Sequence, residues 1–316
     1  MVTSGSRGRT AQRRHISRIL IRLAAPVTGA DSGPVLTSRA PLTLPPAERT
    51  AARVSYRDAL VAPLAGYRPL LLDLVVPAGP APDGGHPVVV FLYGGAPAAG
   101  SHKHSRLGDQ VTDRLVAAGF AVARAQYRHG REAPFPAQIH DVKAAVRWVR
   151  HHAGDLELDA GRVAAWGHSA GGYLAAMLAV TADDPGFDGD LGITGPSSRV
   201  AAAIAWSPPT DFTHIPPPPA GFALHSTGHD PHDWRPDATA SPLFHVSAGA
   251  APLLLVHGTD DIGIPIAHSE ALVAAYWRAG ADADLVRLDG TGHFYGERKL
   301  QQVTGDGIAF LRAHLG

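Results

Sequence analysis

The 316-residue chain contains no cysteine, which excludes a disulfide framework, a thiolate nucleophile and a zinc site built on cysteine. It also carries no net charge, because 28 lysines and arginines balance 28 aspartates and glutamates. A chain without a cationic field has little to attract nucleic acid or an anionic membrane, so we expect no nucleic-acid partner. No apolar run approaches the roughly 18 residues of a membrane-spanning helix, so we expect no membrane span. What is present is 45% hydrophobic residues, enough for a large buried core.

The first 45 residues differ from the rest of the chain. They begin with a basic segment, and the apolar run that follows it, 19–25, is short and contains Arg22. A secretory signal needs about 7–15 apolar residues after its basic start, so the sequence favours a disordered leader. We therefore expect a leader over residues 1–45, one globular domain over residues 46–316 and a cytoplasmic location. Export by an N-terminal signal is the alternative.

From about residue 50 onward, short apolar runs alternate with helical patterns. The run 88–93 is rich in β-branched residues and stops at Gly94-Gly95, as expected of a strand buried on both faces. Strands and helices that alternate every ~25–40 residues predict an α/β fold with a mostly parallel sheet flanked by helices. The predicted strands cover 70–76, 88–93, 120–123, 162–166, 200–206, 253–257 and 284–288, and the predicted helices cover 109–118, 137–152, 170–181, 267–279 and 304–314.

Residues 211–245 break this alternation. The segment has little periodicity and contains four consecutive prolines at 216–219. Loops of this length in compact domains usually carry function or are disordered, so we expect a lid-like insert over the carboxyl edge of the sheet. Three histidines and an aspartate in the insert are of the kinds that bind zinc, but the flanking prolines and glycines favour a solvated loop. We therefore expect no metal at these four residues, which are His225, His229, Asp230 and His232.

The strongest local pattern is Gly167-His168-Ser169-Ala170-Gly171-Gly172, which lies between an apolar run and a helical run. A Gly-x-Ser-x-Gly sequence in this position is typical of a nucleophile elbow, a tight turn that projects a serine hydroxyl above the sheet. Ser169 is therefore the predicted nucleophile. The N–H of Ala170, at the positive end of the following helix, is a predicted donor to an oxyanion. The alternative is an ordinary strand-to-helix turn with Ser169 as its N-cap.

A serine hydroxyl needs a base to remove its proton and a carboxylate to orient that base. After a nucleophile elbow the acid and then the histidine follow along the chain, and the late, glycine-flanked His293 is the predicted base. The apolar run 253–257 leads into Asp260 and Asp261, and Asp261 is the predicted acid. Asp260 and Asp211, which also follows a predicted strand, are alternative acids.

The loop after the strand at 88–93 supplies the other expected oxyanion donors. Gly95 and Ala96 offer backbone N–H groups, whereas Pro97 cannot donate. Aromatic walls suit ester substrates, and core packing is the alternative for each aromatic residue. The candidate pocket residues on this ground are Tyr173, Trp206 and Phe294.

Seven short motifs follow one another along the chain: Tyr127-Arg128 with Glu132 to Asp141, Trp166 to Gly172, Pro209-Thr210-Asp211, Ser241-Pro242, His257-Gly258, Asp261 to Pro265 and Gly290 to His293. In this order they resemble the α/β-hydrolase esterases of the hormone-sensitive-lipase and bacterial feruloyl-esterase-like (BD-FAE) type, over residues 54–316. The resemblance implies an α/β-hydrolase fold and esterase activity. It also favours Asp261: such enzymes carry the acid in an Asp-x-x-Val-Pro pattern, which Asp261, with Ile264 and Pro265, matches better than Asp260 does.

One position departs from that family. Such esterases usually carry histidine before the paired glycines of the oxyanion loop, and this chain has Tyr93 there. The donors Gly95 and Ala96 are kept, so hydrolysis is still expected, but the acyl pocket is expected to differ and Tyr93 joins the candidate pocket residues. We expect four other motif residues, Tyr127, Arg128, Glu132 and Asp141, to be structural.

These residues predict a serine hydrolase that cleaves carboxylic esters through an acyl-enzyme, with a small ester or acyl compound as its partner and no cofactor. Two alternatives stay open. The same triad can transfer an acyl group, close a ring or cleave an amide or peptide, because a fold does not fix the reaction. A non-catalytic binding module on the same fold is the other alternative. The sequence leaves the oligomeric state open.

Overall fold

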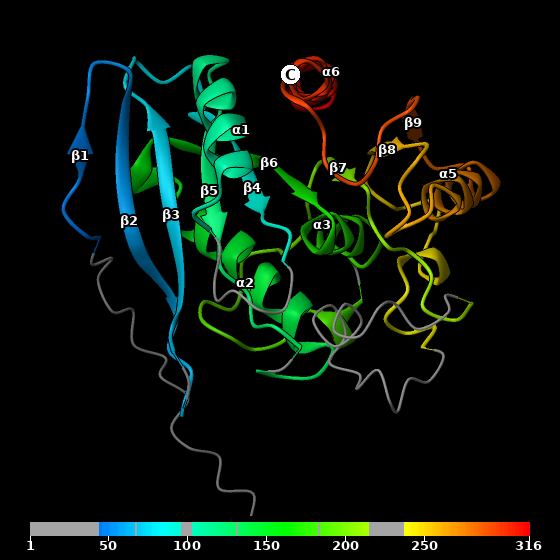
Figure 1. Ribbon diagram of the computed structural model, residues 1–316. Helices are drawn as coiled ribbons and strands as arrows, with labels where there is room; N and C mark the ends of the chain where they lie inside the picture. Colours follow the sequence, from blue (N-terminus) through cyan, green and yellow to red (C-terminus); the bar gives the residue numbers. More distant parts are fainter. Residues whose placement is uncertain (1–43, 67, 96–102, 131, 183, 215–236) are drawn as a thin grey trace, which may run out of the picture. The chain divides into compact units, whose positions relative to one another are not determined.

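The computed structural model describes residues 44–66, 68–95, 103–130, 132–182, 184–214 and 237–316 (Figure 1). The predicted leader therefore lies almost wholly outside the described residues. So do Ala96 and most of the predicted insert, including His225, His229, Asp230 and His232. Within the described ranges, no helix is both long enough and apolar enough to cross a bilayer. The same ranges contain no cluster of three or more His, Asp or Glu side chains that could hold a metal ion.

The described residues form one sheet of nine strands in the order β1-β2-β3-β5-β4-β6-β7-β8-β9. The pairs β1–β2, β2–β3 and β3–β5 are antiparallel, and the remaining neighbours are parallel. The mostly parallel sheet predicted from the alternation is thus confirmed. The strands are β1 (Glu48–Arg49), β2 (Arg53–Ala62), β3 (Leu70–Pro77), β4 (His86–Leu92), β5 (Ala121–Ala125), β6 (Leu158–His168), β7 (Ala203–Trp206), β8 (Leu253–Gly258) and β9 (Ala283–Leu288).

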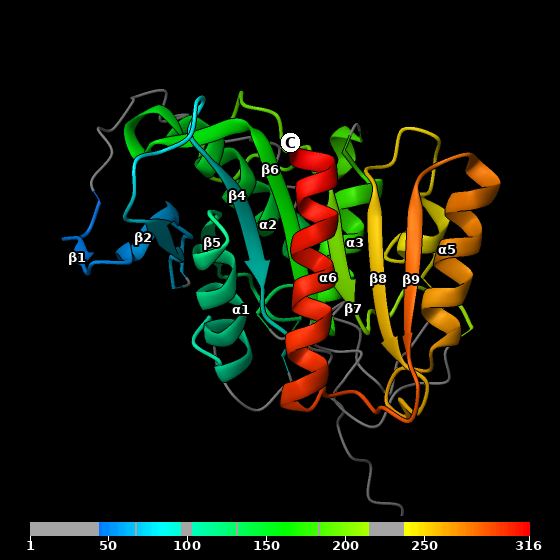
Figure 2. The ribbon, with the colours of Figure 1, turned by 90° about the horizontal axis from the view of Figure 1, so that it is seen from above.

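Helices cover both faces of the sheet (Figures 1 and 2). Helices α1 and α6 pack on one face, and α2, α3 and α5 pack on the other, so the apolar core forms two separate clusters. Each predicted helix is present, although α6 begins earlier than expected, at the exposed Glu297. The helices are α1 (Arg106–Ala117), α2 (Ala137–His151), α3 (Ala170–Val180), α5 (Ala267–Ala279) and α6 (Glu297–Leu315).

Helix α3 is the best-buried helix and the one that positions the predicted nucleophile. All of its residues are buried, because its sequence AGGYLAAMLAV is apolar on every side. A helix of this composition packs inside a protein rather than on its surface. Its small side chains allow close contact with β6 and β7. The turn at its N-terminus therefore stands on a rigid support.

Strand β2 is the main element that the sequence analysis missed. Arg57 and Asp58 interrupt it, so the sequence shows no continuous apolar run or clean alternation. Asp58 has a φ of 59°, and the pairing with β3 shifts register between Tyr56 and Ala59. A bulge inserts extra residues into one strand, so the side chains no longer alternate strictly between the two faces of the sheet. The period-two pattern in the sequence is lost as a result.

Candidate active site

Ser169 lies in the sharp turn between β6 and α3. Its backbone has φ 58° and ψ −120°, a strained conformation for a residue other than glycine, as expected of a nucleophile elbow. The turn closes because Gly167 has no side chain: a Cβ there would overlap the backbone of Gly171. Ala170 is the first residue of α3, so its N–H has no partner within the helix. The turn thus presents a hydroxyl and a free helix-terminal N–H side by side.

The three predicted catalytic side chains form one hydrogen-bonded chain. The Oγ of Ser169 lies 3.0 Å from Nε2 of His293, and Nδ1 of His293 lies 2.7 Å from Oδ2 of Asp261. A carboxylate only accepts hydrogen bonds, so Nδ1 carries the proton and Nε2 is left to accept the serine O–H. The residues come from the ends of β6, β8 and β9, which meet at one edge of the sheet. This arrangement can transfer a proton from the hydroxyl to the imidazole.

The side chain of Asp261 is fully buried, accepts three hydrogen bonds and lies near a fourth N–H group. Its Oδ1 accepts the N–H groups of Gly263 and Ile264, at 2.9 and 2.8 Å. Its Oδ2 accepts from His293 and lies 3.4 Å from Nε2 of His257. Burial alone would raise the pKa of Asp261, but the hydrogen bonds from His257, His293 and Ile264 outweigh it and lower the pKa well below the ordinary value of 3.8. The carboxylate therefore stays ionised opposite the imidazole.

The two alternative acids make other contacts. Asp260 is exposed and accepts a hydrogen bond from the hydroxyl of Thr259. Asp211 accepts from the backbone and hydroxyl of Thr213 and contacts His214. Neither contacts His293, so both have the turn-stabilising contacts typical of aspartate in loops.

Part of the predicted oxyanion loop is described. Gly94 packs directly against the elbow: a Cβ there would lie 2.8 Å from the carbonyl oxygen of His168 and 3.2 Å from Cβ of Ser169. Only glycine permits this approach, and Gly95 is the next residue along the chain. Ala96, the other predicted donor on this loop, lies outside the described residues.

The candidate pocket residues occupy different environments. Tyr93, Tyr173 and Trp206 are buried in the apolar core. Phe294 is 78% exposed, next to His293, and lines a cavity of about 300 Å³ together with His168 and Tyr295. Phe294 is therefore the candidate with a solvent-facing ring beside the triad. A pocket role for the other three stays a prediction.

Sequence reasoning placed two further histidines in motifs near the predicted triad but did not predict their contacts. His168 precedes Ser169, is buried, and its Nε2 donates to the carbonyl of His293 at 2.9 Å. His257, at the end of β8, donates through Nε2 to the carbonyl of Ile264 at 2.8 Å. A polar residue in an otherwise apolar strand was the available signal for His257. The elbow motif that contains His168 gave no signal of this contact, because the partner lies 125 positions away in the chain.

Buried neutral histidines should make the fold acid-sensitive. Burial lowers the pKa of both His168 and His268 to about 4 from the ordinary 6.5, and His293 adds to the shift at His168. Between about pH 6.5 and 4 the unfolded chain binds protons that the folded chain does not, so the free energy of unfolding falls as the pH drops through this window. Melting curves by circular dichroism at about pH 7, 5.5 and 4.5 should show this fall.

The variant His268→Gln supplies the control for that prediction. Nδ1 of His268 accepts the N–H of Thr210 at 3.2 Å, which requires the neutral ring. Glutamine does not titrate, so the melting temperature of the variant should depend less on pH across the same window. An unchanged pH dependence would contradict a contribution from His268.

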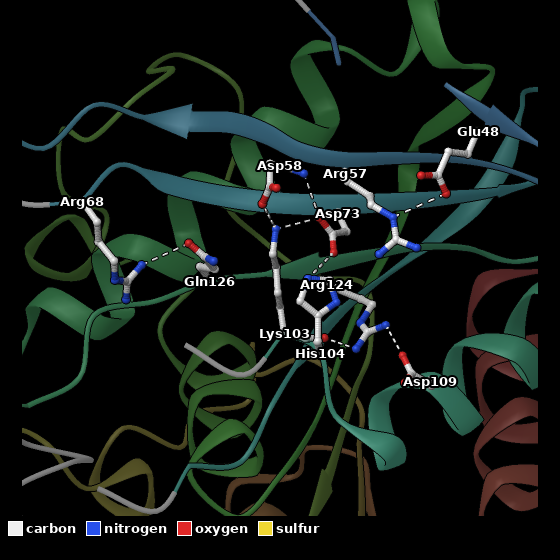
Figure 3. A network of polar contacts seen from close by, with 10 residues as sticks. All are labelled: Glu48, Arg57, Asp58, Arg68, Asp73, Lys103, His104, Asp109, Arg124 and Gln126. Atoms are coloured by element: carbon white, nitrogen blue, oxygen red, sulfur yellow. Dashed lines mark hydrogen bonds and ion pairs between the residues drawn. The ribbon is translucent and has the colours of Figure 1, made fainter. Parts of the chain in front are cut away.

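A buried lysine, Lys103, anchors the chain just before α1 (Figure 3). The side chain of Lys103 is 2% exposed, and its Nζ pairs with the carboxylates of Asp58 and Asp73. Asp73 also accepts the N–H of Asp58 at 2.8 Å, and the guanidinium of Arg124 donates to the carbonyl of Lys103. A buried ammonium is tolerated only when it is paired in this way. The network fixes the start of α1 against β2, β3 and β5.

The sheet order, the two helical layers and the elbow after β6 together define an α/β hydrolase fold. The sequence model of the BD-FAE family matches residues 72–276. The chain belongs to this family.

The chain is also similar to individual esterases. LipC and LipQ of Mycobacterium tuberculosis are 29% and 31% identical to it, over 66% and 68% of this chain and 52% of each relative. The chain thus spans about half the length of these relatives. A truncated carbohydrate esterase from gut microbiota has a similar structure, with a TM-score of 0.69 and 26% identity over 85% of this chain and 99% of that one. Esterase 2 of Thermogutta terrifontis with propionate bound gives a TM-score of 0.64 and 25% identity over 83% and 94%.

Proposed function

We propose that this chain is a carboxylesterase that uses Ser169, His293 and Asp261 as a catalytic triad and works through an acyl-enzyme. The observation that carries the proposal is the continuous hydrogen-bonded chain from the Ser169 hydroxyl through His293 to the buried carboxylate of Asp261. Membership of an esterase-like family and similarity to named esterases support the same activity.

The first half-reaction acylates the serine. Nε2 of His293 removes the proton as Oγ of Ser169 attacks the ester carbonyl, and the carboxylate of Asp261 stabilises the imidazolium that forms. Negative charge develops on the carbonyl oxygen, where the N–H groups of Ala170 and Gly95 can donate to it. The tetrahedral intermediate collapses when His293 returns the proton to the leaving alkoxide. The alcohol departs and the acyl group stays on Oγ.

The second half-reaction releases the acid. Water takes the place of the alcohol, His293 removes its proton, and hydroxide attacks the acyl carbon. The second tetrahedral intermediate expels Oγ, which recovers its proton from His293. One ester bond and one water are consumed, and the protein ends unchanged.

Small acyl groups are the substrate class that we propose to test first. The related Thermogutta esterase has been seen with propionate bound and also phosphorylated by paraoxon. We therefore expect the purified chain to release nitrophenolate from p-nitrophenyl acetate and propionate. We also expect paraoxon to add one diethylphosphoryl group to the peptide that contains Ser169, as read by mass spectrometry.

Two measurements separate this proposal from other uses of the fold. A chain that neither releases nitrophenolate nor takes up the phosphoryl group would be a binding module. If products formed with an added amine contain mainly the amide rather than the free acid, the acyl group goes to an acceptor other than water.

A further inference from the structure

The three residues after β4 are Tyr93, Gly94 and Gly95, and they include the proposed oxyanion donor, the N–H of Gly95. Tyr93 is buried, Gly94 packs against Ser169 and the carbonyl of His168, and Gly95 follows. Peptide groups are planar, so the direction of the Tyr93 carbonyl fixes the direction of the Gly94 N–H. With Gly94 confined by the elbow, the same carbonyl also limits where the Gly95 N–H points.

That carbonyl is held by a second tyrosine. The hydroxyl of Tyr127 donates to the carbonyl of Tyr93 at 2.7 Å, and the hydroxyl of Tyr93 donates back to the carbonyl of Tyr127 at 3.3 Å. The two rings stack with their centroids 4.5 Å apart and their planes 16° from parallel. A Cβ at position 95 would lie 4.0 Å from the Tyr127 hydroxyl oxygen and 3.8 Å from the nearest ring atom of His129, so the Tyr127 hydroxyl is close to Gly95.

Tyr127 itself is firmly placed. Its carbonyl also accepts from Nη2 of Arg68 at 3.0 Å, and the same guanidinium contacts Gln126 (Figure 3). The next residue, Arg128, forms a bidentate ion pair with Asp141 at 2.7 to 3.1 Å, and that carboxylate is fully buried on α2.

The Tyr127 hydroxyl also keeps its proton. Burial, with a smaller contribution from Tyr93, raises the pKa of Tyr127 well above its ordinary value of 10.0. The phenol therefore remains a donor at pH values up to and above 10.0.

We infer that Tyr127 and Tyr93 are positioning residues for the oxyanion hole, because their paired hydroxyls fix the Tyr93–Gly94 peptide and thereby aim the Gly95 N–H at the developing negative charge. The inference rests on the proposed esterase function. It gives a specific role to the position at which this chain differs from the esterases it resembles, and to a tyrosine that sequence analysis treated as structural.

The variant Tyr127→Phe tests the inference, since it removes one hydroxyl and keeps the ring stack. We expect kcat for p-nitrophenyl acetate to fall about tenfold with KM within about twofold, a smaller loss than the roughly 10²–10³-fold that follows removal of a donor itself. An alkyl trifluoromethyl ketone adds to the serine and places its oxyanion in the hole. Its Ki should rise by the same factor as kcat falls. Tyr93→Phe should have a smaller effect, because the hydrogen bond that it removes is longer.

Tyr276→Phe is the matched control. Tyr276 is buried on α5, and its hydroxyl has no hydrogen-bond partner among the described residues. The same chemical change there should leave kcat and Ki unaltered. If the tyrosine pair acts as a unit, the double variant Tyr93→Phe/Tyr127→Phe should lose less than the product of the two single losses.

A purely structural role would lower the melting temperature of Tyr127→Phe and leave the ratio of Ki to KM at the wild-type value. That result, with an active wild type, would overturn the inference and leave the proposed function standing. A wild-type chain with no esterase activity and no paraoxon adduct would overturn both.

Discussion

Replacing Ser169 with alanine is expected to lower kcat for p-nitrophenyl acetate by about 10⁶-fold, the scale seen when a serine hydrolase loses its nucleophile. The reason is geometric: Ser169 is the hydroxyl that lies 3.0 Å from Nε2 of His293 at the end of the buried helix α3. Removal of Oγ leaves the imidazole and the oxyanion donors in place with nothing to acylate. Nitrophenolate release and the loss of the paraoxon adduct measure the effect.

The Ser169→Ala chain should remain folded. Alanine at φ 58° is as strained as serine there, so the substitution adds little strain of its own. Far-UV circular dichroism and the melting temperature check this point. If the folded variant kept more than about 1% of wild-type kcat, the nucleophile would have to lie elsewhere.

Asp261→Asn is expected to lower kcat by about 10⁴-fold near neutral pH. An asparagine amide can still accept the N–H groups of Gly263 and Ile264, so the loop after β8 should hold its shape. It does not hold His293 in the tautomer with its proton on Nδ1, and it carries no charge to stabilise the imidazolium. Initial rates with p-nitrophenyl acetate measure the loss, and KM should change far less than kcat.

Two further variants serve as controls for Asp261→Asn. Asp260→Asn makes the same chemical change at the adjacent, exposed residue, and Asp211→Asn makes it at the other candidate acid. Neither side chain contacts His293 in the described structure, so each variant should stay within about twofold of wild-type kcat. A loss at either position larger than that at Asp261 would reassign the acid.

The sequence was informative wherever function depends on residues close together in the chain. The elbow at Ser169, the turn after the strand that ends in Asp261 and the glycine-flanked His293 each have a local pattern, and the structure brings the three side chains together. The parallel strands were predictable for a similar reason, because burial on both faces demands continuous apolar runs. The turn after the strand favoured Asp261 over Asp260, and the resemblance supported that choice. In the structure the buried N–H of Ile264 donates to Asp261.

Other features depend on pairings that no local pattern encodes. The substitution at Tyr93 was visible, but its meaning needed the stacked ring of Tyr127, 34 residues further on. His168 and its carbonyl partner at His293 are further apart still. A buried Lys103 contradicts the ordinary preference of lysine for the surface, and only the two carboxylates from β2 and β3 explain it.

The family match covers only part of the sheet and its helices, which matters for the design of shorter fragments. The match ends at residue 276, before β9, the proposed base His293 and α6. It begins at residue 72, inside β3 and after the whole of β1 and β2, including Asp58. A fragment cut at those limits would keep the elbow but leave its hydroxyl without a proton acceptor, and would strip one of the two counter-ions from the ammonium of Lys103. A recombinant fragment should therefore include every element from β1 to α6, and not only residues 72–276.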